Sequence, residues 1–246
     1  MNDFLHPEFA PHAKNLMEII RWAQAANPEP EEMLECIARD DKWNASYGWA
    51  MELLMQNRVA CLGGFAYGVP MFSATACTGL LQTAQKMGEK HGFTPNHEEA
   101  ESEQIPEIVV KHYDESAYGE LVGSIEYMNV WFLLIYHTIP KSVSSIQFTK
   151  YEPSETPRGN WHHDLDSDFT AVVSLAPELF EGGGTDLRLT PTSYFSLDKL
   201  PKGYALLFNG KQIQHRGRAV TSGVRHLLTF WLDSAPESDT LPDRQV

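Results

Sequence analysis

Short runs of apolar residues at alternate positions follow one another from Ser144 to Leu232, and turn-forming Gly, Pro and Ser lie between them. The first run alternates Ile146 and Phe148 with polar neighbours, which is the period of a strand with one buried face. Further strands are expected at 169–175, 186–190, 204–208, 218–221 and 224–232. Because no helical segment separates these runs, they predict an antiparallel sandwich or barrel of the jelly-roll kind.

The first half of the chain has a helical pattern instead. Apolar residues cluster at helical spacing from about Pro11 to Gln56, and Asn27-Pro28-Glu29-Pro30 separates two of the clusters. Helices are also expected over 74–90 and over 118–136, although the second of these apolar runs leaves a strand open as the alternative. A short strand at 59–62 is expected to end at Gly63-Gly64.

Together these patterns predict an α+β fold with a double-stranded β-helix core, also called a jelly-roll or cupin-like core, and flanking N-terminal helices. With 246 residues, a single domain 1–246 is expected. It divides into an N-terminal helical region 1–58, a core 59–233 with helical insertions and a C-terminal tail 234–246. The acidic, proline-containing segment 94–107 is expected to be a solvated loop, either a lid or an insertion.

The net charge limits the classes of molecule that the protein is expected to bind. The chain has 19 Lys+Arg against 33 Asp+Glu, a formal net charge of -14, which repels phosphate backbones and attracts cations. Nucleic acid is therefore not expected as a partner, and neither is a membrane, because no apolar run approaches the ~20 residues that span a bilayer. Cys36, Cys61 and Cys77 lack the spacing of a disulfide framework or zinc site, and residues 1–7 lack a secretory signal. We expect a cytoplasmic location and reduced thiols.

A metal site is expected around Trp161-His162-His163-Asp164. In extended chain, side chains at i and i+2 project from one face about 7 Å apart, so His162 and Asp164 can share an ion. His163 should then point to the opposite side, where it either supports the ligands from outside or packs. If His215 from a later strand joins them, two histidines and a carboxylate form the facial triad of non-haem iron(II) oxygenases. A lone His-x-Asp has a plainer alternative, a pair of surface residues.

An anion site is expected beside the metal. Arg225 lies on the last strand, and its planar guanidinium can hold a carboxylate with two hydrogen bonds. Tyr151 ends the first strand on the same face as Gln147 and Thr149, where its phenol could donate to the same carboxylate. The alternatives are an ordinary surface arginine and a core or rim tyrosine.

The segment from about Tyr151 to Asp233 resembles the iron(II)- and 2-oxoglutarate-dependent dioxygenases, and among them the procollagen lysyl hydroxylases and prolyl 4-hydroxylases. The resemblance implies that His162, Asp164 and His215 hold iron(II), that Arg225 forms a salt bridge to the distal carboxylate of 2-oxoglutarate, and that Tyr151 hydrogen-bonds to it. The matching residues, in order, are His162-His163-Asp164, Phe169-Thr170, Phe180 through Gly182-Gly183-Gly184 to Thr185, Pro201 to Leu207, His215-Arg216-Gly217 and Val220 to Arg225.

The resemblance further implies an oxidoreductase that uses iron(II), 2-oxoglutarate and dioxygen, with ascorbate as an optional stimulant, and releases succinate and carbon dioxide. The acid at Asp164 argues against halogenation, because related halogenases have a small residue there. An amino acid, a peptidyl residue or another small molecule is the expected substrate, and the acidic charge favours lysine or arginine over proline. Alternatives left open are a natural-product oxygenase acting by hydroxylation or desaturation, a non-catalytic metal-binding jelly-roll, and a nucleic-acid demethylase, which the acidic charge disfavours.

Two further features receive structural interpretations. Gly182-Gly183-Gly184 is expected to supply positive φ angles at a tight strand connection rather than any catalytic group. Trp161 and Trp231 are expected to be wall or core residues.

Overall fold

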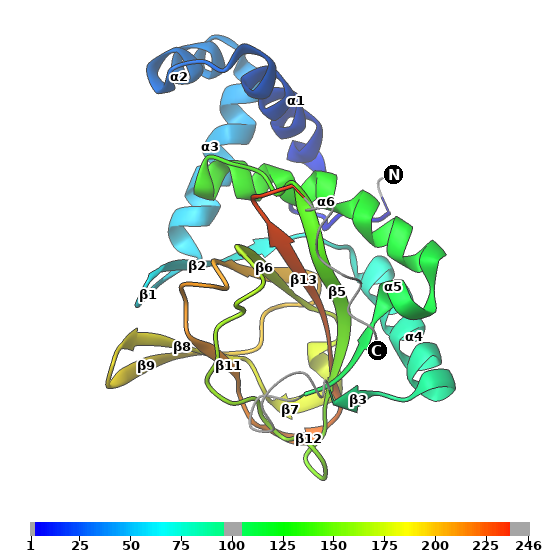
Figure 1. The fold of residues 1–246 in the computed structure, drawn as a ribbon. Helices are drawn as coiled ribbons and strands as arrows, with labels where there is room; N and C mark the ends of the chain where they lie inside the picture. The colour runs from blue at the N-terminus through cyan, green and yellow to red at the C-terminus, as the bar shows by residue number, and fades with distance from the viewer. Residues whose placement is uncertain (1–2, 96–104, 237–246) are drawn as a thin grey trace.

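The computed structural model describes residues 3–95 and 105–236. Most of the segment expected to be a loop or lid at 94–107, and most of the expected tail at 234–246, therefore lies outside the described residues. Figure 1 shows helices gathered along one side of a large curved sheet and short strands on the other side.

The large sheet takes strands from both halves of the chain, in the order β1-β2-β10-β6-β13-β5-β4-β3. Its neighbouring strands are antiparallel. The strands are β1 (Arg58–Cys61), β2 (Gly64–Pro70), β3 (Thr94–Pro95), β4 (Pro106–Val109), β5 (Ser142–Tyr151), β6 (Phe169–Ser174), β10 (Tyr204–Phe208) and β13 (Arg225–Asp233). This combination of helices with a large antiparallel sheet confirms the predicted α+β class.

Two smaller sheets face the large one, β11-β8-β9 and β12-β7. Their strands are β7 (Phe180–Gly182), β8 (Thr185–Thr190), β9 (Ser193–Leu197), β11 (His215–Gly217) and β12 (Val220–Gly223). The predicted glycine role is confirmed, since Gly182, Gly183 and Gly184 have φ angles of 75°, 72° and 96° between β7 and β8. A side chain at any of the three would be strained.

Side chains of the central strands alternate between an apolar face of the sheet, here called the dry face, and a face that lines a cavity. On β13, Leu228, Phe230 and Leu232 are fully buried in the main hydrophobic cluster, which also contains residues of α1 and α6. The intervening residues Arg225, Leu227, Thr229 and Trp231 instead line a cavity. Because successive side chains of a strand point to opposite faces, one strand both packs against the helices and furnishes the site.

The helices cover the dry face of the sheet. The long apolar run that left helix and strand open is a helix, α6, whose N-cap Asp114 accepts a hydrogen bond from Ala117 N and whose Trp131 and Phe132 are fully buried. Within the described residues, no helix is both long and apolar enough to cross a bilayer. The helices are α1 (Ala10–Ala26), α2 (Pro30–Arg39), α3 (Asp41–Gln56), α4 (Ala74–His91), α5 (Val110–Tyr113), α6 (Glu115–Tyr136) and a short 3-10 helix, Pro177–Leu179.

Several strands were not predicted. Gly63-Gly64 does not end a solitary strand but turns the chain into β2, with Cys61 opposite Gly64 in the hairpin. Of the expected strand at 218–221, only 220–221 lie in a strand, β12, whereas Arg218 and Ala219 lie between β11 and β12. β9 was also missed; four of its five residues are exposed, so its sequence has no alternation of buried apolar and exposed polar residues.

The three cysteines are free thiols, as expected. Burial raises the pKa of Cys77 to about 12 and that of Cys61 to about 11. Because the thiolate is the reactive form, both side chains are poor nucleophiles at neutral pH.

An ionic cluster ties three separate segments together at the end of β13. Lys211 Nζ lies 2.8 Å from Asp168 Oδ1 and 3.2 Å from Asp233 Oδ1. The other oxygen of Asp168 accepts a hydrogen bond from the backbone N–H of Ser234. Burial opposes ionisation of Asp168, but Lys211 and Ser234 outweigh it and lower the pKa of this carboxyl to about 2.

We predict that Asp168→Asn lowers the free energy of unfolding by about 2 kcal/mol at pH 7. The folded-state pKa of Asp168 is below its unfolded value, so its contribution is complete above about pH 4 and is lost as the pH falls toward 2. Urea unfolding at pH 7 and pH 3 measures both effects. As a control, Asp198→Asn removes a 92 % exposed carboxylate from its pair with Arg218 and should cost less than about 1 kcal/mol. A difference between wild type and Asp168→Asn that is equal at both pH values would contradict the assignment.

Candidate metal centre and its cavity

Two histidines from separate segments are paired through their backbones. His162 N donates to His215 O and His215 N donates to His162 O, both at 3.0 Å, which forms an isolated antiparallel bridge. Residues directly opposite in such a pair direct their side chains to the same face. One ligand atom from each of His162, Asp164 and His215 lies within 4.8 Å of the others. These groups could hold one metal ion.

Backbone carbonyls orient both imidazoles. His162 Nδ1 lies 2.8 Å from Asn160 O, and His215 Nδ1 lies 3.1 Å from Ile213 O. A carbonyl oxygen can only accept, so each Nδ1 carries the proton and each Nε2 keeps its lone pair for a cation. Burial lowers the pKa of His215 to about 4, which keeps its ring neutral at physiological pH. The edge-to-face contact of Phe208 with the His215 ring, at 4.5 Å between centroids, supports the ring from behind.

The carboxylate of Asp164 divides its oxygens between two tasks. Oδ1 lies 3.5 Å from His162 Nε2 and 3.7 Å from His215 Nε2, whereas Oδ2 accepts a 2.6 Å hydrogen bond from Thr170 Oγ1. Burial opposes ionisation, but His215, His162 and Thr170 outweigh it and hold the pKa of Asp164 below its usual value. An ionised acid with one oxygen directed at two imidazole Nε2 atoms suits a divalent cation.

The three groups face a cavity of about 600 Å³, a size typical of small-molecule sites. Arg225 and Tyr151 also line it, and they are direct partners across β13 and β5. The structure therefore brings all five predicted site residues to one cavity. Of the described residues that line it, Arg225 is the sole lysine or arginine.

Arg225 is a buried cation with unused hydrogen-bonding capacity. It is 5 % exposed, and its Nη1 has no hydrogen-bond partner among the described residues. Burial lowers the pKa of Arg225, and the rings of Tyr151 and Phe180 lie 5.3 Å and 6.0 Å from its guanidinium carbon. A buried guanidinium without a full set of acceptors is unfavourable, so an anion at this position would relieve the cost.

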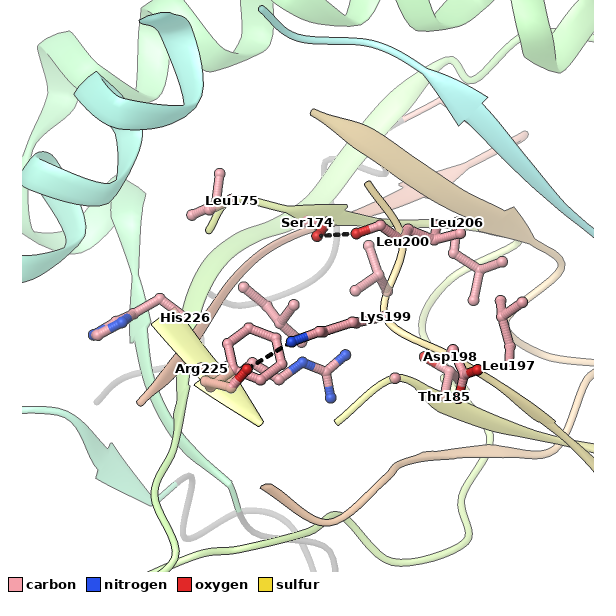
Figure 2. A pocket seen from close by; sticks show the side chains of 14 residues that line it. Ser174, Leu175, Thr185, Leu197, Asp198, Lys199, Leu200, Leu206, Arg225 and His226 are labelled. Atoms are coloured by element: carbon pink, nitrogen blue, oxygen red, sulfur yellow. Dashed lines mark hydrogen bonds between the residues drawn. The ribbon is translucent and has the colours of Figure 1, made fainter. Parts of the chain in front are cut away.

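A second cation near Arg225 is already engaged. Lys199 and Arg225 both line a second, much smaller cavity of about 20 Å³, and Figure 2 shows the Lys199 side chain beside Arg225. Lys199 Nζ donates to the carbonyl oxygens of Pro177 and Phe180 at 2.8 Å and 2.7 Å. This small cavity has room for a single water and not for an organic acid.

The wall beside Arg225 and Tyr151 is polar. Glu107, Gln147 and Thr149 are buried residues of β4 and β5 that line the cavity. Gln147 Nε2 donates to Glu107 Oε1 at 3.3 Å, and Thr149 Oγ1 has no hydrogen-bond partner among the described residues. A wall of this kind favours a polar ligand, because buried polar groups require partners.

Some positions differ from expectation. His163 does not pack, since it is exposed and lines the rim of the cavity. Trp231 is a wall residue as predicted, but Trp161 lies outside the set of described cavity-lining residues and is neither wall nor core. The hydrogen bond of Thr170 to Asp164 was missed, although Thr170 is among the residues quoted for the resemblance. Gly217 was also passed over, although a Cβ there would lie 2.7 Å from Tyr151 OH.

Comparisons with known proteins place this arrangement among solved structures. No protein-family model and no curated protein matches the sequence. A prolyl-4-hydroxylase from Pseudomonas putida superimposes with a TM-score of 0.54 at 14% identity, over 76% of this chain and 99% of the other. The α-ketoglutarate-dependent carbocyclase SnoK of nogalamycin biosynthesis gives 0.56 at 16%, over 75% and 83%.

The epimerase SnoN, in a complex with Fe3+, α-ketoglutarate and nogalamycin RO, gives a TM-score of 0.57 at 12% identity, over 81% of this chain and 93% of the other. At such low identity the likeness concerns the fold. It confirms the predicted jelly-roll core, because α-ketoglutarate-dependent proteins share this architecture with the chain.

We predict that Thr170→Val weakens binding of a divalent metal by roughly 10-fold or more, since removing an outer partner of a ligand typically costs 10–100-fold. The substitution preserves shape but leaves Asp164 Oδ2 without its hydroxyl donor. Titration of the metal-free protein with Co(II), followed by visible absorption, measures the change. Thr229→Val is the matched control, because Thr229 lines the same cavity on β13 without bonding Asp164. Equal affinities in both variants would remove Thr170 from the site.

Proposed function

We propose that this protein is an iron(II)- and 2-oxoglutarate-dependent oxygenase that hydroxylates an aliphatic C–H bond of an amino acid or peptidyl residue. The observation that carries the proposal is the convergence of His162, Asp164 and His215 on a cavity that also contains the buried Arg225. The reaction balances as substrate C–H plus 2-oxoglutarate and dioxygen, giving substrate C–OH, succinate and carbon dioxide.

His162, Asp164 and His215 would hold the iron. Two imidazoles and one ionised carboxylate fit iron(II), and three protein ligands leave coordination positions open. The bound iron would supply dioxygen activation, coupled to oxidation of the keto acid. The contribution of the chain is to orient these ligands through Asn160, Ile213 and Thr170, and to keep the site within a walled cavity.

Arg225 and Tyr151 would bind the distal carboxylate of 2-oxoglutarate. The guanidinium offers parallel N–H donors, and its unpartnered Nη1 gains an acceptor when a carboxylate binds. Tyr151 lies opposite Arg225 in the strand register, so its phenol can approach the same anion. Since Lys199 is engaged with backbone carbonyls, Arg225 is the cation available to the cavity among the described residues.

A natural-product oxygenase is the second candidate. The carbocyclase SnoK and the epimerase SnoN, both similar in fold to this chain, come from the nogalamycin system, so the fold is compatible with substrates other than amino acids. Succinate release stimulated by free or peptide-embedded lysine, arginine or proline supports the first candidate. Stimulation by polycyclic small molecules alone supports the second.

We predict that His215→Ala and Asp164→Ala abolish succinate formation, because each removes a metal ligand from a three-ligand set. His163→Ala should retain much of the activity, since His163 is exposed and does not belong to the group that could hold a metal. Succinate is quantified with iron(II), 2-oxoglutarate and dioxygen supplied. An equal loss of activity in His163→Ala would show that the ligand histidine was wrongly chosen.

We predict that Arg225→Ala raises the Kd for 2-oxoglutarate by roughly 100-fold or more, the equivalent of about 3–5 kcal/mol for the loss of a buried charge partner. Anaerobic titration of the iron(II)-loaded protein with 2-oxoglutarate, read from the charge-transfer absorption band, measures the affinity.

Arg218→Ala is the control, because its guanidinium is already paired with Asp198 and Asp186. An unchanged Kd in Arg225→Ala would exclude Arg225 from the keto-acid site. Absence of the absorption band in the wild-type protein would instead indicate a non-catalytic metal-binding module.

A further inference from the structure

The segment that carries His162 has little regular structure of its own. Residues 152–168 form neither helix nor strand, apart from the single bridge between His162 and His215. Its other backbone hydrogen bonds to the β10–β11 region are from Gly159 N to Gly217 O, from Asp164 N to Gly210 O and from Lys211 N to Ser167 O. The position of the His162 ring therefore depends on what holds this segment against β11.

On the outer side of the same segment, Trp161 lies over two guanidinium groups. The guanidinium carbons of Arg188 and Arg216 lie 4.0 Å and 4.6 Å from the centre of the Trp161 ring. Tyr194 closes the group with an edge contact to Trp161 at 5.6 Å between ring centroids. Among the aromatic side chains, the indole face of tryptophan attracts a cation most strongly.

Both guanidinium groups are themselves held in place. Arg216 Nε lies 2.8 Å from Asp186 Oδ2, directly across the β11–β8 pair. Arg188 Nε donates to Gln214 Oε1 at 3.1 Å, and Ser196 Oγ donates to Asp186 Oδ1 at 2.7 Å. The three-stranded sheet thus presents a fixed platform on which the indole rests.

The order of residues makes this contact relevant to the metal centre. Trp161 precedes His162, and Arg216 follows His215. His162 and His215 line the cavity, whereas Trp161 and Arg216 are not among its described lining residues. The contact between Trp161 and Arg216 therefore supports the backbone bridge between His162 and His215 from the side that faces away from the cavity.

We propose that Trp161 and Arg216 are positioning residues, forming an outer clasp that holds His162 and His215 at the spacing that one metal ion requires. Arg188 serves the clasp as the second support of the indole. This inference rests on the proposed ligand set but not on catalysis, because it concerns the affinity of the metal-free protein for its metal.

The test is titration of the metal-free full chain with Co(II) alone, followed by the visible ligand-field spectrum. Trp161→Ala is expected to weaken Co(II) binding roughly 10-fold, the scale typical of outer partners of metal ligands, and to alter the band shape. Trp161→Phe, which keeps an aromatic face, should recover most of the affinity. Arg216→Lys keeps the charge but loses the planar group, and should fall between wild type and Trp161→Ala.

Arg58→Ala is the matched control. Its guanidinium lies 5.4 Å from the Phe65 ring in the β1–β2 hairpin, so the change removes a comparable pair away from the histidines and should leave Co(II) affinity unchanged. Circular dichroism establishes that each variant is folded at the titration temperature. If Trp161→Ala does not fold, Arg216→Lys decides, because weaker Co(II) binding is expected for it and wild-type binding would contradict the inference.

The inference is overturned if the folded variants bind Co(II) with wild-type affinity and spectrum, and such a result leaves the proposed function intact. Failure of the wild-type protein to bind Co(II) would instead refute the metal centre and the clasp together. Absence of succinate formation, with Co(II) binding and its dependence on Trp161 preserved, would refute only the proposed function.

Discussion

The backbone pairing of His162 with His215 is the interaction on which the site depends. It joins a segment without regular structure to β11, and it directs two imidazoles from distant parts of the chain into one cavity. Two hydrogen bonds form this pairing, and single backbone hydrogen bonds of Gly159, Asp164 and Ser167 flank it. The neighbouring contacts, from Thr170 to Asp164 on the inside and from Trp161 to the arginines on the outside, therefore matter for how closely the three ligand groups are held.

The large sheet allows a polar site to exist within a stable fold. Its central strands place apolar residues against the helices and polar residues toward the cavity, so the core and the site share a backbone but not a face. Burial of the apolar face provides the main stabilisation. The polar face can then hold Thr149 and Arg225 with incomplete hydrogen bonding, a cost that the rest of the fold offsets.

The cavity lining is acidic apart from Arg225, so a small anion is expected to bind at Arg225. Arg225 lies opposite Tyr151, whereas Glu107, Asp164 and Asp166 supply the carboxylates of the described lining. A cation and a metal-capable group that line the same cavity suit a dianion with one end at each position. That arrangement connects the geometry of the cavity to a keto acid as co-substrate under the proposed function.

The sequence by itself determined the strand alternation, the jelly-roll class, and the residue types that converge on the cavity, because period and residue chemistry are local properties. It also predicted the glycine conformations before β8. Its division of the chain into helical region, core and tail stays a prediction. Tertiary structure alone decided that β1 and β2 join the large sheet, that Thr170 reaches Asp164, that His163 is exposed, and that Trp161 rests on two arginines. Each of these depends on contacts between segments far apart in the chain, and no local pattern encodes which distant partner a side chain meets.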